Sequence, residues 1–102
     1  MFKASGATVY PTEAEAALRT IRAVTQAYVT NVTERTGELV GAAVVTREAM
    51  TVAELDREAR ARLSSFKVPK RWVLLRSPAD VPTMATGKVD KGGLQELLRR
   101  GA

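Results

Sequence analysis

The first regular pattern along the chain is a helical repeat of apolar positions that follows Pro11. Thr12 and, three residues later, Glu15 have the spacing of a capping box, which predicts that a helix begins at this point. The apolar side chains that follow have the spacing of one helix face: Ala14, Ala17, Leu18 and Ile21. Glu13 and Glu15 are expected to stabilise the helix N-terminus through the helix dipole rather than to act as acid–base catalysts.

Two β-strands are predicted after this helix. The run from Val24 to Val32 is rich in β-branched residues, which favour strands. Residues 33–38, which include Gly37, form a plausible turn. The next run, from Leu39 to Thr46, is apolar almost without interruption, and this indicates a strand that is buried on both faces.

A second helix is predicted from Thr51, because Thr51 and Glu54 form another capping box. Met50 and Leu55 stand at the two positions of a hydrophobic staple. The predicted buried face consists of Val52, Leu55, Ala59 and Leu63. The expected ion pairs on the outer face are Asp56–Arg60 and Glu58–Arg62. The helix should end before Pro69, which disfavours helical geometry at the residue before it.

The C-terminal third contains one more strand and one more helix. Residues 71–75 read as a strand with Trp72 in the core or an interface, and a loop with Pro78 and Pro82 follows. Three leucines predict a short final helix, with Gly101 as its stop: Leu94, Leu97 and Leu98. We therefore predict a single α+β domain over residues 1–102, with a three-stranded sheet, about three helices packed on it and a possible short N-terminal hairpin.

The composition excludes several kinds of chemistry. The chain has 102 residues, of which 45% are apolar, and it contains neither cysteine nor histidine. Ser-His-Asp catalysis, Cys-His catalysis and His- or Cys-based metal sites are therefore excluded, and we expect no metal site. No apolar run approaches the roughly 20 residues that cross a bilayer, so we expect no membrane span. A cysteine-free chain is compatible with a cytoplasmic location.

The net charge of +5 indicates an anionic partner. One cluster of basic residues could meet phosphates or an acidic surface, or could simply be solvated: Lys67, Lys70, Arg71 and Arg76. A stand-alone basic module that binds nucleic acid is one alternative. Only 5% of the residues are aromatic, however, and the basic residues alternate with acidic ones, so nucleic acid is not the expected partner.

The segment Pro82–Lys88 is the most informative for chemistry. It follows the third strand in a predicted exposed loop, where Gly87 gives backbone freedom and Lys88 supplies a charge on a flexible stem. It is not a Walker A loop. Pro82 stands where that motif needs glycine, and Val89 stands where it needs a hydroxyl for magnesium.

This segment resembles the C-terminal Pro-x-x-x-x-Gly-Lys motif of the adenylate-forming superfamily, which includes the AMP-forming acyl-CoA synthetases. Met1–Glu15 is similar to that family's hydrophobic-Lys-x-x-Gly-x-x-Val-x-Pro-x-Glu-x-Glu segment, and Leu63–Pro69 to its Leu-x-x-aromatic-Lys-Val-Pro element. The three motifs occur in family order and at family spacing. Together they span nearly the whole chain, so it resembles the small C-terminal domain of these enzymes, called the lid.

The resemblance implies roles for individual residues. Lys88 corresponds to the lysine that stabilises charge during adenylation, with Thr86 and Gly87 beside it as binding residues. Lys3, Ser5 and Gly6 correspond to the loop that approaches the pantetheine arm during thioester formation. For Lys3, a solvated lysine near the chain end is an equal alternative. Several relatives carry glutamine where Thr8 stands, so that contact is not carried over.

The implied activity is that of an acid–thiol ligase of fatty acid metabolism, with Mg-dependent ATP and coenzyme A as co-substrates. Neither is expected to bind tightly to this domain alone. The implied partners are a larger N-terminal domain with the ATP and acyl sites, acyl-adenylate and CoA. The isolated domain is expected to be inactive. The alternative within the family is the lid of an adenylation enzyme that transfers to a carrier protein.

Overall fold

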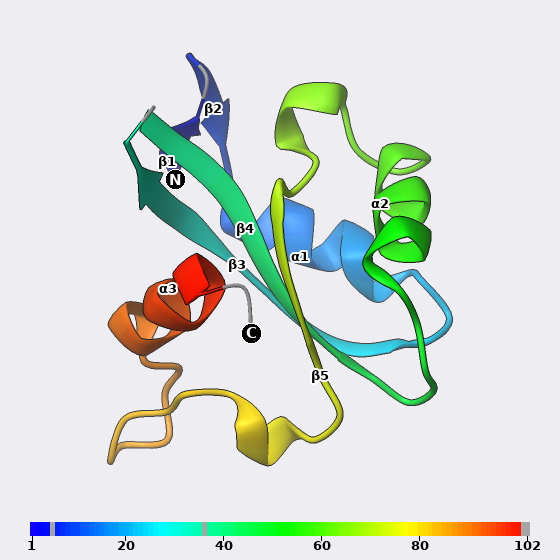
Figure 1. Cartoon of the computed structure of the whole chain (residues 1–102), viewed down its shortest axis with the longest axis vertical. Coiled ribbons are helices and arrows are strands. Elements are labelled where there is room, and N and C mark those ends of the chain that lie inside the picture. The colour runs from blue at the N-terminus through cyan, green and yellow to red at the C-terminus, as the bar shows by residue number, and fades with distance from the viewer. Residues whose placement is uncertain (5, 36, 101–102) are drawn as a thin grey trace.

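A three-stranded sheet with helices on its two faces forms the body of the molecule (Figure 1). The computed structural model describes residues 1–4, 6–35 and 37–100. The strands in these ranges are β1 (Phe2–Ala4), β2 (Ala7–Val9), β3 (Val24–Glu34), β4 (Gly37–Thr46) and β5 (Arg71–Leu75). The helices are α1 (Pro11–Arg19), α2 (Val52–Arg60) and α3 (Lys91–Arg100), with short 3₁₀ helices η1 (Ser65–Lys67) and η2 (Pro78–Asp80).

The sheet has the order β3-β4-β5. β3 and β4 pair antiparallel, with Val32 opposite Leu39, and β4 and β5 pair parallel, with Gly41 opposite Arg71. A parallel pair needs a crossover connection, and α2 and η1 lie within it. The N-terminal hairpin, β1 and β2, forms a separate two-stranded sheet. The predicted α+β fold, its three-stranded sheet and its N-terminal hairpin are thus confirmed.

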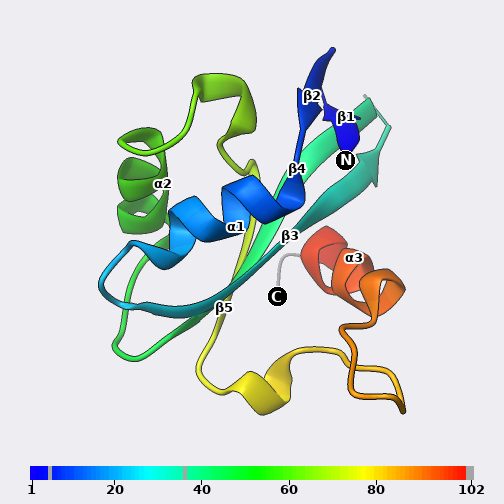
Figure 2. The ribbon, with the colours of Figure 1, turned by 180° about the vertical axis from the view of Figure 1, so that it is seen from behind.

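The central strand β4 is buried on both faces, as its apolar run predicts. Val40, Ala42 and Val44 join a core cluster with α1 and α2, whereas Ala43 and Val45 join a second cluster with α3. This alternation follows from the two-residue period of a strand. In the two opposite views, α1 lies behind the strands in Figure 1 and in front of them in Figure 2. The sheet therefore separates α1 and α2 from α3.

Gly41 of β4 allows α3 to pack closely on the sheet. A Cβ atom at this position would lie 2.6 Å from Val32 Cγ2 and 2.9 Å from Leu98 Cδ1, both too close for a real contact. Leu98 is fully buried, and Leu94, one turn earlier in α3, is 3% exposed. The small residue on the strand and the two leucines on the helix thus fix the position of α3.

The capping box predicted at Thr12 is wrong. The structure begins α1 one residue earlier, at Pro11, with Tyr10 at the cap position and no side-chain cap hydrogen bond. The physical reason is that proline suits the first helical position, since its φ is already helical and the amide hydrogen it lacks has no partner there. The apolar face is confirmed, because Ala14 and Leu18 are buried.

The two acidic residues of α1 have different roles. Glu13 lies in the first turn, as predicted, and its carboxylate also pairs with Lys67 Nζ at 2.6 Å. Glu15 lies beyond that turn, so its predicted role at the helix N-terminus is wrong. The Val29 backbone N–H donates to Glu15 Oε2 at 2.9 Å. Because β3 is an edge strand, Glu15 satisfies a donor that would otherwise face outward from the sheet.

The second helix follows the prediction more closely. Thr51 and Glu54 form the capping box, and Leu55 and Ala59 are buried. The two expected ion pairs are present, at 2.7 Å for Asp56–Arg60 and 2.8 Å for Glu58–Arg62. Val52 is 47% exposed, so its predicted place on the buried face is wrong. Met50, just before the cap, packs against the core cluster that contains Leu55, and Val52 is left outside.

The remaining predictions for the C-terminal third agree with the structure. β5 has the predicted bounds, and Trp72 belongs to the core. The final helix buries Leu94 and Leu98. The predicted stop at Gly101 lies outside the described residues.

Candidate functional site

Lys88 lies on a short hairpin formed by residues 82–90, which we call the lysine hairpin. Its arms meet at a bridge between Thr83 and Val89. The Met84 N–H donates to the Lys88 carbonyl at 2.7 Å, and the Gly87 N–H donates to the Met84 carbonyl at 2.9 Å. Gly87 has φ of 89°, the left-handed conformation that closes a three-residue hairpin loop. The backbone of Lys88 is therefore held inside a hydrogen-bonded turn.

The side chain of Lys88 is exposed, as are Thr86 and Gly87 beside it. Within the described ranges, none of the ion pairs involves Lys88. The lysine hairpin thus combines a fixed backbone with an accessible positive charge. This arrangement could place an ammonium group against an anion presented by another surface.

Asp90 joins the lysine hairpin to α3. Its backbone N–H donates to the Pro82 carbonyl at 2.9 Å and closes the base of the hairpin. Its side chain then accepts from the Gly93 N–H at 3.1 Å, in the manner of a helix N-cap. An aspartate just before an apolar helical repeat is a sequence signal for a helix N-cap. Sequence reasoning assigned no role to Asp90, because it considered this segment only for the motif that contains Lys88.

The N-terminal hairpin holds the second set of predicted site residues. Lys3 pairs with Thr8 across the two strands and is exposed. Gly6, at the turn, is exposed and has φ of 79°. Ser5 lies outside the described residues. Gly6 therefore offers a turn without a side chain at the surface, as close backbone approach to a ligand requires.

The structure does not bring the two sets of predicted residues together. With the longest axis of the molecule vertical, the N-terminal hairpin lies at the top and the segment 82–90 at the bottom, in both Figure 1 and Figure 2. One binding event on a rigid domain would therefore use one set or the other. The sheet and α3 lie between the two.

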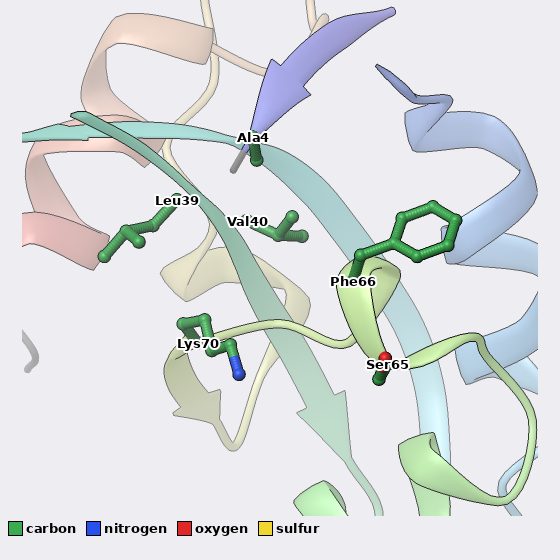
Figure 3. Close-up of a pocket in the computed structure, with 6 residues that line it drawn as sticks. All are labelled: Ala4, Leu39, Val40, Ser65, Phe66 and Lys70. Carbon is green, nitrogen blue, oxygen red and sulfur yellow. The ribbon is translucent and has the colours of Figure 1, made fainter. Parts of the chain in front are cut away.

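A hollow of 260 Å³ lies beside the N-terminal hairpin (Figure 3). Figure 3 shows Val40 on β4, Phe66 on η1 and Lys70 just before β5 around it. Its lining residues come from four segments: Ala4, Leu39, Val40, Ser65, Phe66 and Lys70. Phe66 is 46% exposed and Lys70 is exposed. An aromatic face and a cation at one hollow suit a ligand that carries both a ring and a phosphate.

Sequence reasoning did not assign Phe66 a role, although it lies within the motif Leu63–Pro69, and it treated Lys70 as one of several basic residues. The structure separates that basic cluster. Lys67 pairs with Glu13 and Arg71 Nε with Glu34 at 2.8 Å, whereas Lys70 lines the hollow. Only the tertiary arrangement distinguishes the cation at the hollow from its paired neighbours.

A second hollow, of 370 Å³, adjoins the lysine hairpin. Its lining includes Val89 of the hairpin, Lys91 of α3, and Pro11 and Glu15 of α1. The surface next to Lys88 is therefore concave.

In the described part of the chain, no group of three or more Asp or Glu side chains is placed to hold a metal ion. No helix among the residues that the structure describes is long and apolar enough to cross a membrane.

Comparisons with known proteins agree on one family. The model of the AMP-binding enzyme C-terminal domain matches residues 13–88, so it ends on Lys88. The 3-oxocholest-4-en-26-oate–CoA ligase of Rhodococcus rhodochrous is 41% identical over 97 residues, which cover 88% of this chain and 17% of that ligase. The chain spans between 15% and 19% of the length of the curated relatives it matches.

Solved structures extend the agreement to the fold. MatB from Rhodopseudomonas palustris, bound to ATP, matches with a TM-score of 0.75 and 31% identity over 89% of this chain and 18% of that one. The o-succinylbenzoate CoA synthetase of Bacillus subtilis, in complex with its acyl-adenylate intermediate, matches with a TM-score of 0.73 and 26% identity over 88% of this chain and 18% of that one. The family match covers most of the chain, and the chain therefore belongs to the AMP-binding enzyme C-terminal domain family.

Proposed function

We propose that this chain is the mobile C-terminal domain of an AMP-forming acid–thiol ligase, with Lys88 acting in acyl-adenylate formation and the N-terminal hairpin acting in thioester formation. The observation that carries the proposal is the lysine hairpin, which holds the backbone of Lys88 while leaving its charge exposed. The partner is a larger domain of the same enzyme that binds ATP and the acid.

In the first half-reaction, a carboxylate oxygen of the acid bonds to the α-phosphorus of ATP. The bond between that phosphorus and the bridging oxygen to the β-phosphate breaks, so that acyl-AMP forms and pyrophosphate leaves. Negative charge is crowded between the carboxylate and the α-phosphate as they approach. An ammonium group positioned there lowers the energy of the charged transition state, and Lys88 supplies it. Thr86 and Gly87 leave the approach to Lys88 open, since both are small and exposed.

In the second half-reaction, the thiol of coenzyme A attacks the acyl carbonyl carbon, AMP leaves and the thiol proton passes to solvent or a base. Gly6 permits close approach of the pantetheine arm, and Lys3 lies on the adjoining strand. The hollow with Phe66 and Lys70 adjoins this hairpin, and its ring and cation suit the base and phosphates of coenzyme A. This feature favours free coenzyme A over a carrier protein as the thiol donor.

The positions of the two hairpins favour a domain that rotates between the half-reactions. Since they lie at opposite ends of the molecule, the same active site can receive them only in turn. ATP and coenzyme A are then co-substrates of the complete enzyme, and no cluster of three or more acidic side chains in the described residues is available for a magnesium ion that accompanies ATP.

The acid is proposed from the two relatives that are at least 40% identical to this chain, although a third, 32% identical, is named for 2-succinylbenzoate. The ligases from Rhodococcus rhodochrous and Mycolicibacterium smegmatis are both named for 3-oxocholest-4-en-26-oate, and the second also for medium- and long-chain fatty acids. We therefore propose a carboxylic acid with a large apolar body as the substrate class.

The test is Lys88→Ala in a complete ligase that carries this chain, with Lys91→Ala as the matched control. Lys91 is an exposed lysine three positions away, at the start of α3. ATP–pyrophosphate exchange with 3-oxocholest-4-en-26-oate measures the first half-reaction, and thioester formation from supplied acyl-AMP measures the second. We expect exchange to fall roughly a hundred- to thousand-fold for Lys88→Ala. Thioester formation and the Lys91→Ala variant should change little, and an equal loss in both half-reactions would refute the role of Lys88.

A second assay separates the two thiol donors. The adenylate is offered either coenzyme A or a phosphopantetheinylated carrier protein at the same thiol concentration. Faster transfer to coenzyme A supports the proposal, whereas transfer to the carrier protein alone contradicts it.

A further inference from the structure

Asp90 makes three separate contacts at the junction between the lysine hairpin and α3. Its N–H donates to the Pro82 carbonyl at 2.9 Å, and its own carbonyl accepts from the Leu94 N–H at 2.9 Å. Its Oδ1 accepts from the Gly93 N–H at 3.1 Å. The backbone of this one residue thus belongs to the hairpin on one side and to the helix on the other, and its side chain caps the helix.

The helix end of this junction is anchored in the core. Leu94 and Leu98 of α3 pack in the cluster that also contains Val81, which directly precedes the hairpin. Both ends of the segment 82–90 are therefore held, and Asp90 is the last residue before the anchored helix. Residues 83–88 of the hairpin are exposed, whereas Val89 packs against the core cluster of α3, so the position of the exposed part depends on the contacts at the base of the hairpin.

Gly93 allows this close junction. A Cβ atom there would lie 2.9 Å from Pro82 Cβ and 3.1 Å from Asp90 Oδ2. Pro82 Cβ belongs to a rigid ring, so a larger residue at this position would have to push Pro82, at the base of the hairpin, away from the helix. Gly92, next to it, has no neighbour closer than 3.6 Å to the same hypothetical atom.

We propose that Asp90 is a positioning residue for Lys88: by capping α3 and closing the hairpin, it sets where the ammonium group enters the adenylation site. Gly93 supplies the room for this contact. The inference rests on the proposed role of Lys88, and it adds a residue that acts on the reaction only through Lys88. Asp90 touches neither substrate nor the reacting atoms.

The expected effect follows from the sensitivity of such chemistry to position. A displacement of about 1 Å in a reacting group can cost on the order of a hundredfold in rate. Asp90→Ala keeps the backbone hydrogen bond to Pro82 but removes the side-chain acceptor. We expect ATP–pyrophosphate exchange to fall roughly tenfold to a hundredfold. Thioester formation from supplied acyl-AMP should be unchanged.

The rescue experiment distinguishes positioning from charge. Asparagine and serine cap helices about as well as aspartate, so Asp90→Asn and Asp90→Ser should restore most of the exchange rate. A loss in Asp90→Asn as deep as in Asp90→Ala would show that the negative charge matters, and it would overturn the inference. Thr51→Ala is the matched control. It removes an equivalent cap from α2, far from Lys88 in sequence, and should leave exchange unchanged.

Two further variants complete the test. Gly93→Ala should lower exchange selectively, and Gly92→Ala should not. In the double variant Lys88→Ala/Asp90→Ala, exchange should be no lower than in Lys88→Ala alone, since Asp90 has no effect without the lysine. If the fold-loss of exchange in the double variant equalled the product of the two single-variant losses, the inference would be overturned. If Lys88→Ala itself leaves exchange intact, the proposed function fails first; if only Asp90→Ala leaves it intact, the inference alone fails.

Discussion

The two hairpins of this domain differ in what they expose and in how they are supported. The N-terminal hairpin presents a bare glycine turn beside a hollow, and the lysine hairpin presents a charge on a braced turn. Both have a glycine with positive φ at the turn, Gly6 and Gly87, and both glycines are exposed. The difference lies in the support. The lysine hairpin is tied to α3 by Asp90, which suits a charge that must be placed accurately, whereas close backbone approach needs room more than bracing.

The largest effect on stability should come from Gly41, beneath α3. Gly41→Ala forces Leu98 and Val32 apart and should lower the free energy of unfolding by roughly 1–3 kcal/mol. Because α3 carries the lysine hairpin, the first half-reaction should suffer more than the second. Chemical denaturation of the isolated chain measures the free energy of unfolding, and the two half-reaction assays measure the effect on activity. A larger loss in thioester formation than in ATP–pyrophosphate exchange would contradict the proposed link between α3 and the first half-reaction.

The two turn glycines offer a matched pair of substitutions. At both Gly6 and Gly87 a Cβ atom would meet nothing within 4 Å in this domain, so alanine strains the backbone there without clashing with the rest of the domain. That strain is about 1–2 kcal/mol, so we expect roughly a tenfold change in the rate of the half-reaction that uses the turn. Gly87→Ala should slow ATP–pyrophosphate exchange, and Gly6→Ala should slow thioester formation. The comparison fails if both variants affect the same half-reaction.

A smaller effect is expected from Lys70 at the hollow beside the N-terminal hairpin. Lys70→Ala should raise the KM for coenzyme A roughly threefold to tenfold, since an exposed charge contact contributes about 1 kcal/mol. The KM for ATP should not change. Arg76, an exposed cation just after β5 that does not line the hollow, provides the control variant Arg76→Ala. An equal rise in the KM for coenzyme A in both variants would show that the loss comes from net charge rather than from the hollow.

The smallest effect concerns α2, which carries neither hairpin. Hydrogen bonds from the Thr51 backbone and side chain lower the pKa of Glu54 below its ordinary value of 4.5. A lowered folded pKa means that this stabilisation is present above pH 4.5 and is lost as the pH falls through the folded pKa. Glu54→Gln should therefore make stability less dependent on pH in this acidic range. Denaturation midpoints between about pH 3 and pH 6 test this, and unchanged pH dependence would contradict it.

Much of the fold could be predicted because its signals are local. The apolar run of β4, the cap at Thr51 and the leucines of α3 each specify an element within about ten residues. The errors came where two local signals competed. Pro11 displaced the cap predicted at Thr12, and Met50 took the place expected for Val52.

The site was less predictable. Motif spacing pointed to Lys88 and Gly6, and their roles stay predictions. The junction at Asp90 and the hollow with Phe66 and Lys70 depend on segments that only the folded chain brings together, such as Ala4 with residues 65–70.

The most direct test of the account is the ratio of the two half-reaction rates, measured on one enzyme preparation each for Lys88→Ala and Gly6→Ala. The account predicts that exchange divided by thioester formation falls by roughly a hundredfold or more for Lys88→Ala and rises about tenfold for Gly6→Ala. A ratio that stays at the wild-type value in Lys88→Ala would contradict the central claim that this lysine acts only in adenylation.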